Sequence, residues 1–208
     1  MLRKTYATLL FVLATSVAAQ TPTPEEIAAL VDQRVSALNP YGELLNDPDP
    51  ERSLAAMQIM LESGNAELTR MALEFGLLSP NPVVRRAAVE AHLKSGPTLT
   101  LKFEGGDDPD PNFTSTVVGY YSGSTEPGNQ GYWKIKVGEY SADDGCYLHV
   151  NARSGCFVTV NSDGVYFTHD QYKMLAARTD VTDEGLLKGF AKIYKVAEPV
   201  PLTVQLID

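Results

Sequence analysis

Hydrophobic residues between positions 24 and 97 recur every three or four places, which is the spacing of an amphipathic α-helix. In the first predicted helix the stripe consists of Ile27, Leu30, Val31 and Leu38. Each expected helix begins at a residue type that caps free amide groups, and two end at a glycine, which tolerates a left-handed conformation. The starts are Thr23-Pro24-Glu25-Glu26, Asp49-Pro50, Asn65 and Asn81-Pro82, and the closing glycines are Gly64 and Gly96.

The second and fourth predicted helices repeat one another in sequence. Segments 48–64 and 80–96 are identical at seven of seventeen positions, including two prolines and the final glycine. The stretch 79–89, Ser-Pro-Asn-Pro-Val-Val-Arg-Arg-Ala-Ala-Val, resembles HEAT-like repeats, and the resemblance covers about residues 45–97. It implies stacked helices and a protein-binding surface, but no chemistry. One and a half repeats are fewer than the roughly three that a free-standing solenoid needs, so we expect these helices to dock on the rest of the chain. A plain helical bundle is the alternative.

From position 98 onward the hydrophobic period changes to two, which is typical of half-buried β-strands. The turn dipeptides Asp144-Gly145 and Asp163-Gly164 separate some of these strands, and one short helix is expected at about residues 171–177. The alternating sets include Leu99/Leu101/Phe103, Trp133/Ile135/Val137, Val165/Phe167 and Val200/Leu202/Val204/Leu206. The predicted fold is therefore α+β, with N-terminal HEAT-like helical hairpins packed on a C-terminal antiparallel β-sandwich or open barrel.

The first nineteen residues have the pattern of a cleavable signal peptide. Arg3 and Lys4 precede a short apolar segment, and Val17 and Ala19 are the small residues that signal peptidase accepts. The apolar segment is shorter than the roughly 20 residues needed to cross a bilayer, and no later stretch is a candidate membrane span. We therefore expect a signal peptide at 1–19, a helical segment at 20–97 and a β-domain at 98–208, in a periplasmic or secreted protein.

The negative net charge of the chain disfavours partners that are themselves negatively charged. The chain has 17 basic and 26 acidic side chains, and its formal net charge is −9. Such a surplus of negative charge repels phosphate backbones, so nucleic acid is a poor partner, and anionic membrane surfaces are disfavoured for the same reason.

The two cysteines, Cys146 and Cys156, predict a disulfide bond, because an isolated pair in an oxidising compartment is most often bonded. Redox or metal chemistry is the alternative, but no C-x-x-C spacing or neighbouring metal ligand supports it. A simple hairpin through residues 151–155 would hold the two cysteines about 13 Å apart, beyond the reach of a disulfide. We therefore expect 146–156 to form a closed loop, with regular strand pairing from about residue 157.

No catalytic motif is present, although the chain contains three histidines. A Ser-His-Asp triad could be assembled from His149 or His169 with Asp170 and either Ser122 or Ser154. However, the chain lacks the G-x-S-x-G elbow, the H-E-x-x-H metal motif and a phosphate-binding glycine loop. An extracytoplasmic hydrolase that uses His169 or His149 is the alternative function, and we expect no cofactor.

The acidic segment 104–112 contains oxygen ligands at spacings used by calcium loops. Asp108, Asp110 and Asn112 match the first three ligand positions, but Phe113 and Gly119 occupy the positions that need glycine and glutamate. Two interpretations of this segment stay open: an irregular calcium site, or a solvated turn between strands.

Three tyrosines in the strand region, Tyr132, Tyr147 and Tyr166, fall on the polar side of the alternation. Exposed tyrosines offer a large contact area at low entropic cost, which suits a protein or glycan interface. Lys134 and Lys136 flank Tyr132 and favour an acidic partner. The predicted function is a non-enzymatic interaction or ligand-binding protein of the cell envelope, with another envelope protein as its partner. Ordinary strand propensity is the alternative explanation for the tyrosines.

Overall fold

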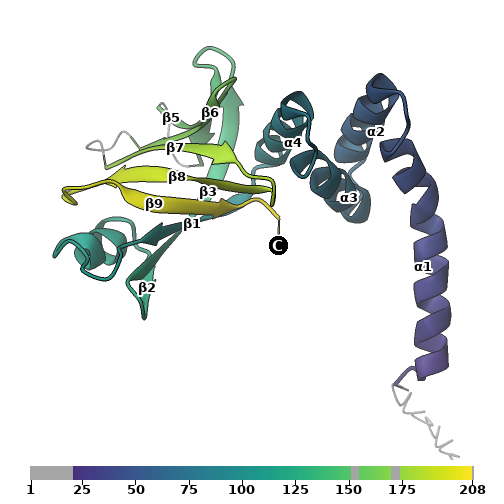
Figure 1. Ribbon diagram of the computed structural model, residues 1–208, viewed down its shortest axis with the longest axis horizontal. Coiled ribbons are helices and arrows are strands. Elements are labelled where there is room, and N and C mark those ends of the chain that lie inside the picture. The colour runs from purple at the N-terminus through teal and green to yellow at the C-terminus, as the bar shows by residue number, and fades with distance from the viewer. Residues whose placement is uncertain (1–20, 151–154, 170–173, 208) are drawn as a thin grey trace, which may run out of the picture. The chain divides into compact units, whose positions relative to one another are not determined.

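The computed structural model describes residues 21–150, 155–169 and 174–207 of the chain. Residues 1–40 and residues 41–208 form two compact units. The helices are α1 (Pro24–Leu45), α2 (Pro50–Glu62), α3 (Ala66–Leu77), α4 (Pro82–Lys94) and the short π-helix η1 (Ser115–Tyr120) (Figure 1). The strands are β1 (Thr98–Glu104), β2 (Ser124–Glu126), β3 (Gln130–Ser141), β4 (Cys146–His149), β5 (Cys156–Asn161), β6 (Gly164–His169), β7 (Leu175–Val181), β8 (Leu186–Ile193) and β9 (Val200–Gln205).

The four predicted helix starts are confirmed, and each is capped by its own side chain. Thr23 and Glu26 form a reciprocal capping box, in which each backbone amide donates to the other side chain, at 2.8 and 3.2 Å. The side chains of Asp49, Asn65 and Asn81 accept hydrogen bonds from the first-turn amides of α2, α3 and α4. The helical region is therefore set largely by local sequence, while the HEAT-like resemblance stays a prediction.

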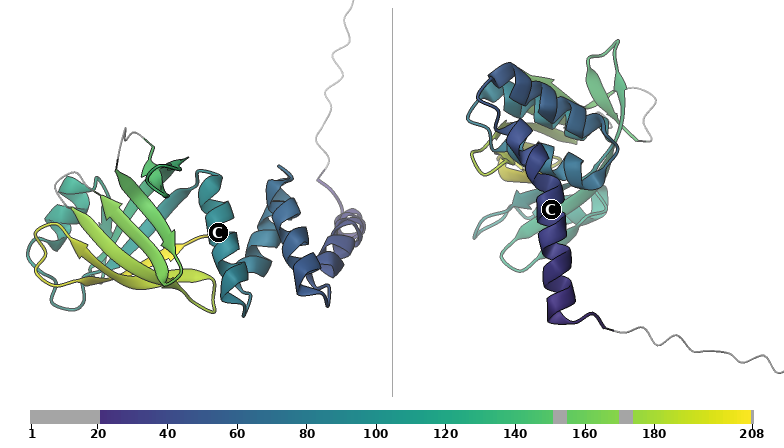
Figure 2. Two further views of the ribbon diagram at one scale, coloured as in Figure 1. Left: turned by 90° about the horizontal axis from the view of Figure 1, so that it is seen from above. Right: turned by 90° about the vertical axis from the view of Figure 1, so that its right-hand side faces the viewer.

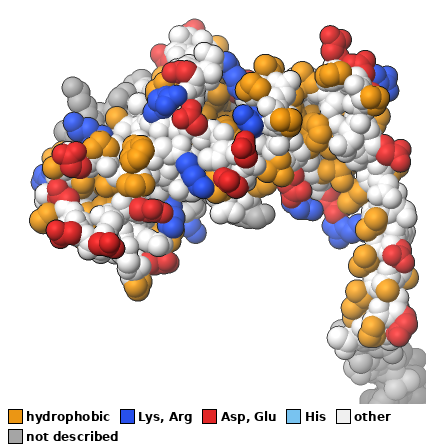
Figure 3. Space-filling model, in the orientation of Figure 1, with side chains coloured by type: hydrophobic (Ala, Val, Ile, Leu, Met, Phe, Trp, Pro, Cys, Tyr) orange, Lys and Arg blue, Asp and Glu red, His pale blue; other side chains and the backbone are white. Residues whose placement is uncertain are grey.

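Helix α1 has an apolar stripe that lies in solvent. Ile27, Leu30, Val31 and Val35 are all exposed, and only Leu45 at the end of the helix is buried. Figure 3 shows hydrophobic side chains along α1 interspersed with acidic ones. The periodicity thus predicted the helix correctly, but these residues do not contribute to the core.

The strands form one antiparallel sheet that closes on itself. Its strand order is β1-β9-β8-β7-β6-β5-β4-β3-β2, and β1 also pairs with β3. Eight strands therefore complete a ring, and the short strand β2 pairs with the beginning of β3. Leu101 illustrates the closure, because it lies opposite Trp133 on β3 and opposite Val204 on β9. Closure pairs both edges of β1, so that the ring itself has no free sheet edge of the kind that promotes aggregation.

The antiparallel strand region is confirmed, but its finer description changes. The sheet is a closed eight-stranded barrel rather than a sandwich or an open barrel, and Figure 2 shows the sheet curling into this barrel. A barrel of eight strands has an interior just wide enough to be filled by side chains. The interior and its ends include the fully buried rings of Phe103, Phe113, Phe157 and Phe167. The prediction of a helix at about 171–177 is wrong for residues 175–177, which belong to β7. Residues 170–173 lie outside the described part of the chain.

Helix α4 lies across one end of the barrel (Figure 2, left). Its Val89 has no exposed surface and lines, together with Val160 and Val165 of the strands, one hollow between the helix and the barrel. Arg85 forms an ion pair of 3.5 Å with Asp183 in the turn between β7 and β8. The buried residues of the helices and of the barrel form a single hydrophobic cluster. The expectation that the helices dock on the strand region therefore holds for residues 41–207.

The predicted disulfide between Cys146 and Cys156 is confirmed, with the two Cα atoms 5.5 Å apart. The expectation that it excludes a β4–β5 pairing is wrong. Tyr147 lies opposite Val158 and Leu148 lies opposite Cys156, so the register shifts by one residue between the two pairs. A β-bulge of this kind bends the strands and alters their twist, which allows the pairing and the disulfide to coexist. Pairing consequently begins one residue earlier than expected.

Two helical glycines provide a test of how tightly the helices are packed. A Cβ atom at Gly76 would lie 2.5 Å from the Cβ of Ala88 and 2.7 Å from the Sδ of Met57, whereas one at Gly42 would meet no atom within 4 Å. We expect Gly76→Ala to lower the free energy of unfolding by about 1–3 kcal/mol, because an overpacked core must shift. The control Gly42→Ala should be neutral or stabilising by up to about 1 kcal/mol, because alanine is the better helix former. Urea denaturation of both variants measures the difference, and equal stabilities would contradict this packing of α3 against α2 and α4.

Candidate functional site

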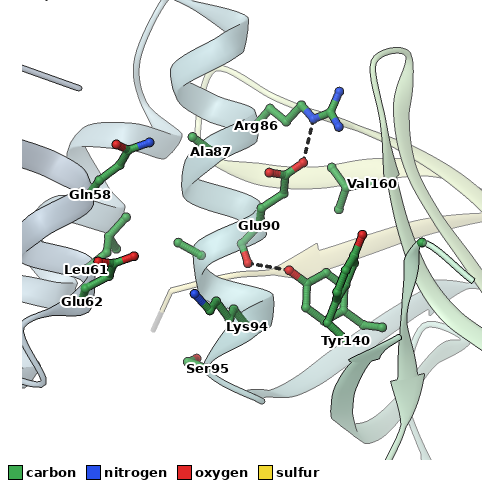
Figure 4. Close-up of a pocket in the computed structure, with 13 residues that line it drawn as sticks. Gln58, Leu61, Glu62, Arg86, Ala87, Glu90, Lys94, Ser95, Tyr140 and Val160 are labelled. Carbon is green, nitrogen blue, oxygen red and sulfur yellow. Dashed lines mark hydrogen bonds and ion pairs between the residues drawn. The ribbon is translucent and has the colours of Figure 1, made fainter. Parts of the chain in front are cut away.

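A large hollow lies along α4, and we call it the α4 groove. It encloses about 780 Å³ and is lined by residues of α2, α4 and the barrel. Helix α4 forms its floor, α2 lies on one side, and Tyr140 of the barrel lies on the other (Figure 4). Its polar lining consists mainly of Gln58, Glu62, Arg86, Glu90, Lys94 and the hydroxyl of Tyr140.

Tyr140 and Tyr147 line the barrel side of this groove. Their rings meet edge to face, with centroids 5.1 Å apart. Tyr147 is only 6% exposed, and its hydroxyl donates a 2.9 Å hydrogen bond to the backbone oxygen of Glu90 on α4. Burial, followed by the nearby Glu90 and Tyr140, raises the pKa of Tyr147 to about 12. Tyr140 is 55% exposed, so its ring is open to a ligand and rests on a fixed neighbour.

The charged side chains on the floor of the groove alternate in sign. Arg86 donates to Glu90 at 2.7 Å, one helical turn away, and the two side chains are 45% and 42% exposed. An exposed pair of this kind contributes little to stability, at most about 1 kcal/mol. Both groups can therefore be redirected to a ligand at low cost. Lys94, one further turn along α4, adds a cation.

A second hollow of about 340 Å³ continues the groove along α4. Arg86 and Val160 line both hollows. Its far wall is the turn between β5 and β6, where Asp163 accepts a 2.6 Å hydrogen bond from the hydroxyl of Tyr166. That hydrogen bond is the main reason why the pKa of Asp163 is lowered. The two hollows therefore adjoin each other at Arg86 and Val160.

The structure places the predicted site residues in different surroundings. Tyr147 is buried beneath α4, so its prediction as an exposed residue is wrong. Tyr132 and Tyr166 are half-buried, and their hydroxyls donate to Gln130 and to Asp163. No contact among the described residues joins Tyr132 to either of the other two. Lys134 and Lys136 are exposed on β3, as expected.

Tyr140, the most accessible aromatic ring of the groove, is not among the site residues predicted from the sequence. Its position follows from a register shift in β3, where Val137 lies opposite His149 but Tyr140 lies opposite Tyr147. One extra residue in β3 breaks the alternation that begins at Trp133. In the sequence, only the repeated occurrence of tyrosine at positions 132, 140 and 147 could have indicated the site.

The other end of the barrel holds a histidine pair, His149 and His169. Their ring centroids lie 5.8 Å apart, and His169 lies 5.7 Å from the ring of Trp133. His149 is in register with buried Val137, and His169 continues the inward alternation of Val165 and Phe167. Burial, and secondarily the charge of His169, lowers the pKa of His149. This pair is thus held against the barrel core.

The structure tests the predicted catalytic triad only in part. It brings His149 and His169 together, whereas Ser154 and Asp170 lie outside the described residues. Ser122 has a left-handed backbone conformation, with φ of 54°, and makes no described contact with either histidine. The hydrolase alternative therefore rests on the histidine pair alone.

The acidic segment 104–112 has a structural role at Asp110. The Asp110 carboxylate accepts hydrogen bonds from the backbone and side-chain nitrogens of Asn112 and from the backbone amide of Ala197. The hydrogen bond from the backbone N–H of Asn112 is the largest cause of the lowered pKa of Asp110. Within the described ranges, no group of three His, Cys, Asp or Glu side chains is placed to hold a metal ion, and the acidic segment therefore forms no such cluster.

Comparison with other proteins adds no functional assignment. No protein family matches the chain, and neither a curated protein nor a solved structure is significantly similar to it. In the part of the chain that is described, none of the helices combines the length and apolar character of a membrane span.

The buried Tyr147 predicts a specific alkaline sensitivity. Its pKa is about 12 in the fold and about 10 in an unfolded chain, so the unfolded form loses its proton first as the pH rises. This contribution to stability is intact below pH 10 and is lost between about pH 10 and 12. Tyr147→Phe should therefore lose less stability than the wild type between about pH 9 and 11, although at pH 7 it lacks a hydrogen bond worth about 1 kcal/mol.

Urea denaturation at the two pH values measures this difference. Tyr140→Phe is the matched control. It removes a hydroxyl from the exposed partner ring and should retain most of the wild-type pH dependence, because burial is a larger cause of the raised pKa of Tyr147 than the nearby Tyr140. An identical loss of stability in Tyr147→Phe and the wild type would show that Tyr147 is not buried under α4.

Proposed function

We propose that the protein is an exported, non-enzymatic binding protein of the cell envelope and that the α4 groove is its binding surface. The exposed ring of Tyr140, held edge to face on the buried Tyr147 beside a large hollow, carries this proposal. The signal-peptide pattern of residues 1–19 supports export. The disulfide between Cys146 and Cys156 fits an oxidising compartment.

Tyr140 has the properties of a binding anchor. Tyrosine is among the residues that contribute most to protein interfaces, because a rigid ring buries a large area at low entropic cost. The Tyr140 ring is supported by Tyr147, whose own position is fixed by its hydrogen bond to Glu90. A ligand would therefore not have to order this part of the site.

The shape and lining of the groove favour an extended peptide segment of another envelope protein. Two hollows that share Arg86 and Val160 adjoin each other along α4, which suits a chain better than a compact small molecule. Gln58, Glu62 and Lys94 supply donors and acceptors of the kind that pair with a peptide backbone. Peptide recognition commonly combines such backbone contacts with a few side-chain anchors.

A hydrolase that uses His149 or His169 is the second candidate. The observation in its favour is that the two imidazole rings lie close together, with centroids 5.8 Å apart. Turnover of ester or peptide substrates that falls in both His149→Gln and His169→Gln would support it. Binding without turnover in the wild type supports the first candidate instead.

The binding proposal predicts that Tyr140→Ala loses the partner but keeps the fold. Partners captured from the native envelope by the wild type are compared with those captured by Tyr140→Ala and by the control Tyr120→Ala, an equally large exposed ring outside the groove. We expect Tyr140→Ala to weaken one partner at least about thirtyfold, equivalent to about 2 kcal/mol, with a melting temperature near that of the wild type.

The control Tyr120→Ala should retain that partner. Retention by Tyr140→Ala, together with loss by a Lys134→Ala/Lys136→Ala double variant, would place the binding surface on the outer face of β3 and contradict the proposal. Photo-crosslinking from position 58, on the opposite wall of the groove, then identifies the segment that is bound.

A further inference from the structure

The histidine pair has an unusual combination of burial and missing partners. The Nδ1 atom of His169 is buried and has no hydrogen-bond partner in the part of the chain that is described. An unsatisfied buried nitrogen costs roughly 1–3 kcal/mol, so such an atom calls for an explanation, and a bound ion or a functional role is among the usual ones. The proposed binding groove at the other end of the barrel does not use it.

The fold holds the two rings together without any help from local sequence. His149 ends β4 and His169 ends β6, so their imidazoles approach each other past the intervening strand β5. Phe157 of β5 lies against the ring of His149, with centroids 6.3 Å apart, and Trp133 lies against His169. The two imidazoles thus pack against aromatic neighbours, and their ring planes are inclined at 50° to each other.

The spacing of the rings suits a shared metal ion. A zinc–nitrogen bond of about 2.0–2.1 Å places a metal about 3 Å from each ring centre, so two imidazoles on one tetrahedral ion have centroids about 5–6 Å apart. The observed centroid distance is 5.8 Å. Imidazole nitrogen is a preferred ligand of Zn²⁺ and Cu²⁺, and Cu²⁺ is bound most tightly by a given nitrogen site.

We propose that His149 and His169 form a two-imidazole site for a divalent transition-metal ion such as Zn²⁺ or Cu²⁺, with the unpartnered Nδ1 of His169 as one ligating atom. Both side chains are partly exposed, so the remaining coordination positions are open to water or to a ligand. The site is independent of the α4 groove, and either proposal can fail without the other.

Trp133, the one tryptophan in the chain, provides a built-in reporter for this site. Its ring lies 5.7 Å from that of His169, a distance at which bound Cu²⁺ quenches indole fluorescence. Titration of the metal-free, full-length protein with Cu²⁺ should therefore give quenching that saturates at one equivalent, and Zn²⁺ should compete. Cu²⁺ electron paramagnetic resonance should show coupling to imidazole nitrogens.

The third histidine of the chain, His92 on α4, supplies the matched control. We expect His149→Gln and His169→Gln each to weaken Cu²⁺ binding at least tenfold and His92→Gln to bind as the wild type does. Equal affinity in all four proteins, or quenching that never saturates, would overturn the proposal. If one variant fails to fold, the wild-type resonance spectrum still decides, because a spectrum without imidazole coupling excludes the site.

Discussion

The packing of α4 across one end of the barrel is the contact on which the proposed binding site depends. Val89 is fully buried on the barrel side of this helix, and Ala88 packs against Gly76 and Met57 on the other. The helix thus belongs to the core of the helical region and to the core of the barrel at once. A groove bordered by α2, α4 and the barrel keeps its shape only because α4 is held on both sides. The hydrogen bond from Tyr147 to Glu90 fixes the helix against the strand that lines the groove.

Closure of the barrel provides the rigid frame for both candidate sites. Because β1 pairs with β3 and β9, every strand of the ring has two neighbours, and the turns between strands gather at the two ends. The end covered by α4 carries Tyr140 and Tyr147, while the opposite end carries the histidine pair. The two sites nevertheless share strand β4, on which His149 lies two residues beyond Tyr147. Two sites of different chemistry can therefore be supported by one small fold.

Local structure was largely predictable from the sequence, and non-local structure was not. Asp49, Asn65 and Asn81 cap their helices through bonds that span two or three residues, so a short stretch of sequence is sufficient to predict them. Closure of the ring depends on the pairing of β1 with β9, about a hundred residues later in the chain, and no local pattern encodes it.

The errors at the candidate site have the same origin. Tyr147 occupies a position that alternation assigned to solvent, but α4 covers it, and helix docking cannot be deduced from the strand itself. Bulges in β3 and between β4 and β5 shift the register at Tyr140 and at Leu148, which defeats strict alternation. The meeting of His149 and His169 likewise arises from strand order and not from spacing.

Native-state hydrogen exchange of α4 tests the central claim, that this helix is fixed to the barrel as part of one cooperative unit. Exchange rates are compared for the amides of α4 and those of the central strands β7 and β8 in the oxidised protein. The account predicts that both sets open only with global unfolding, with opening free energies that agree to within about 1 kcal/mol. Opening of α4 at a free energy several kcal/mol below that of the strands would show that the helix detaches on its own, and the α4 groove would then not be a preformed site.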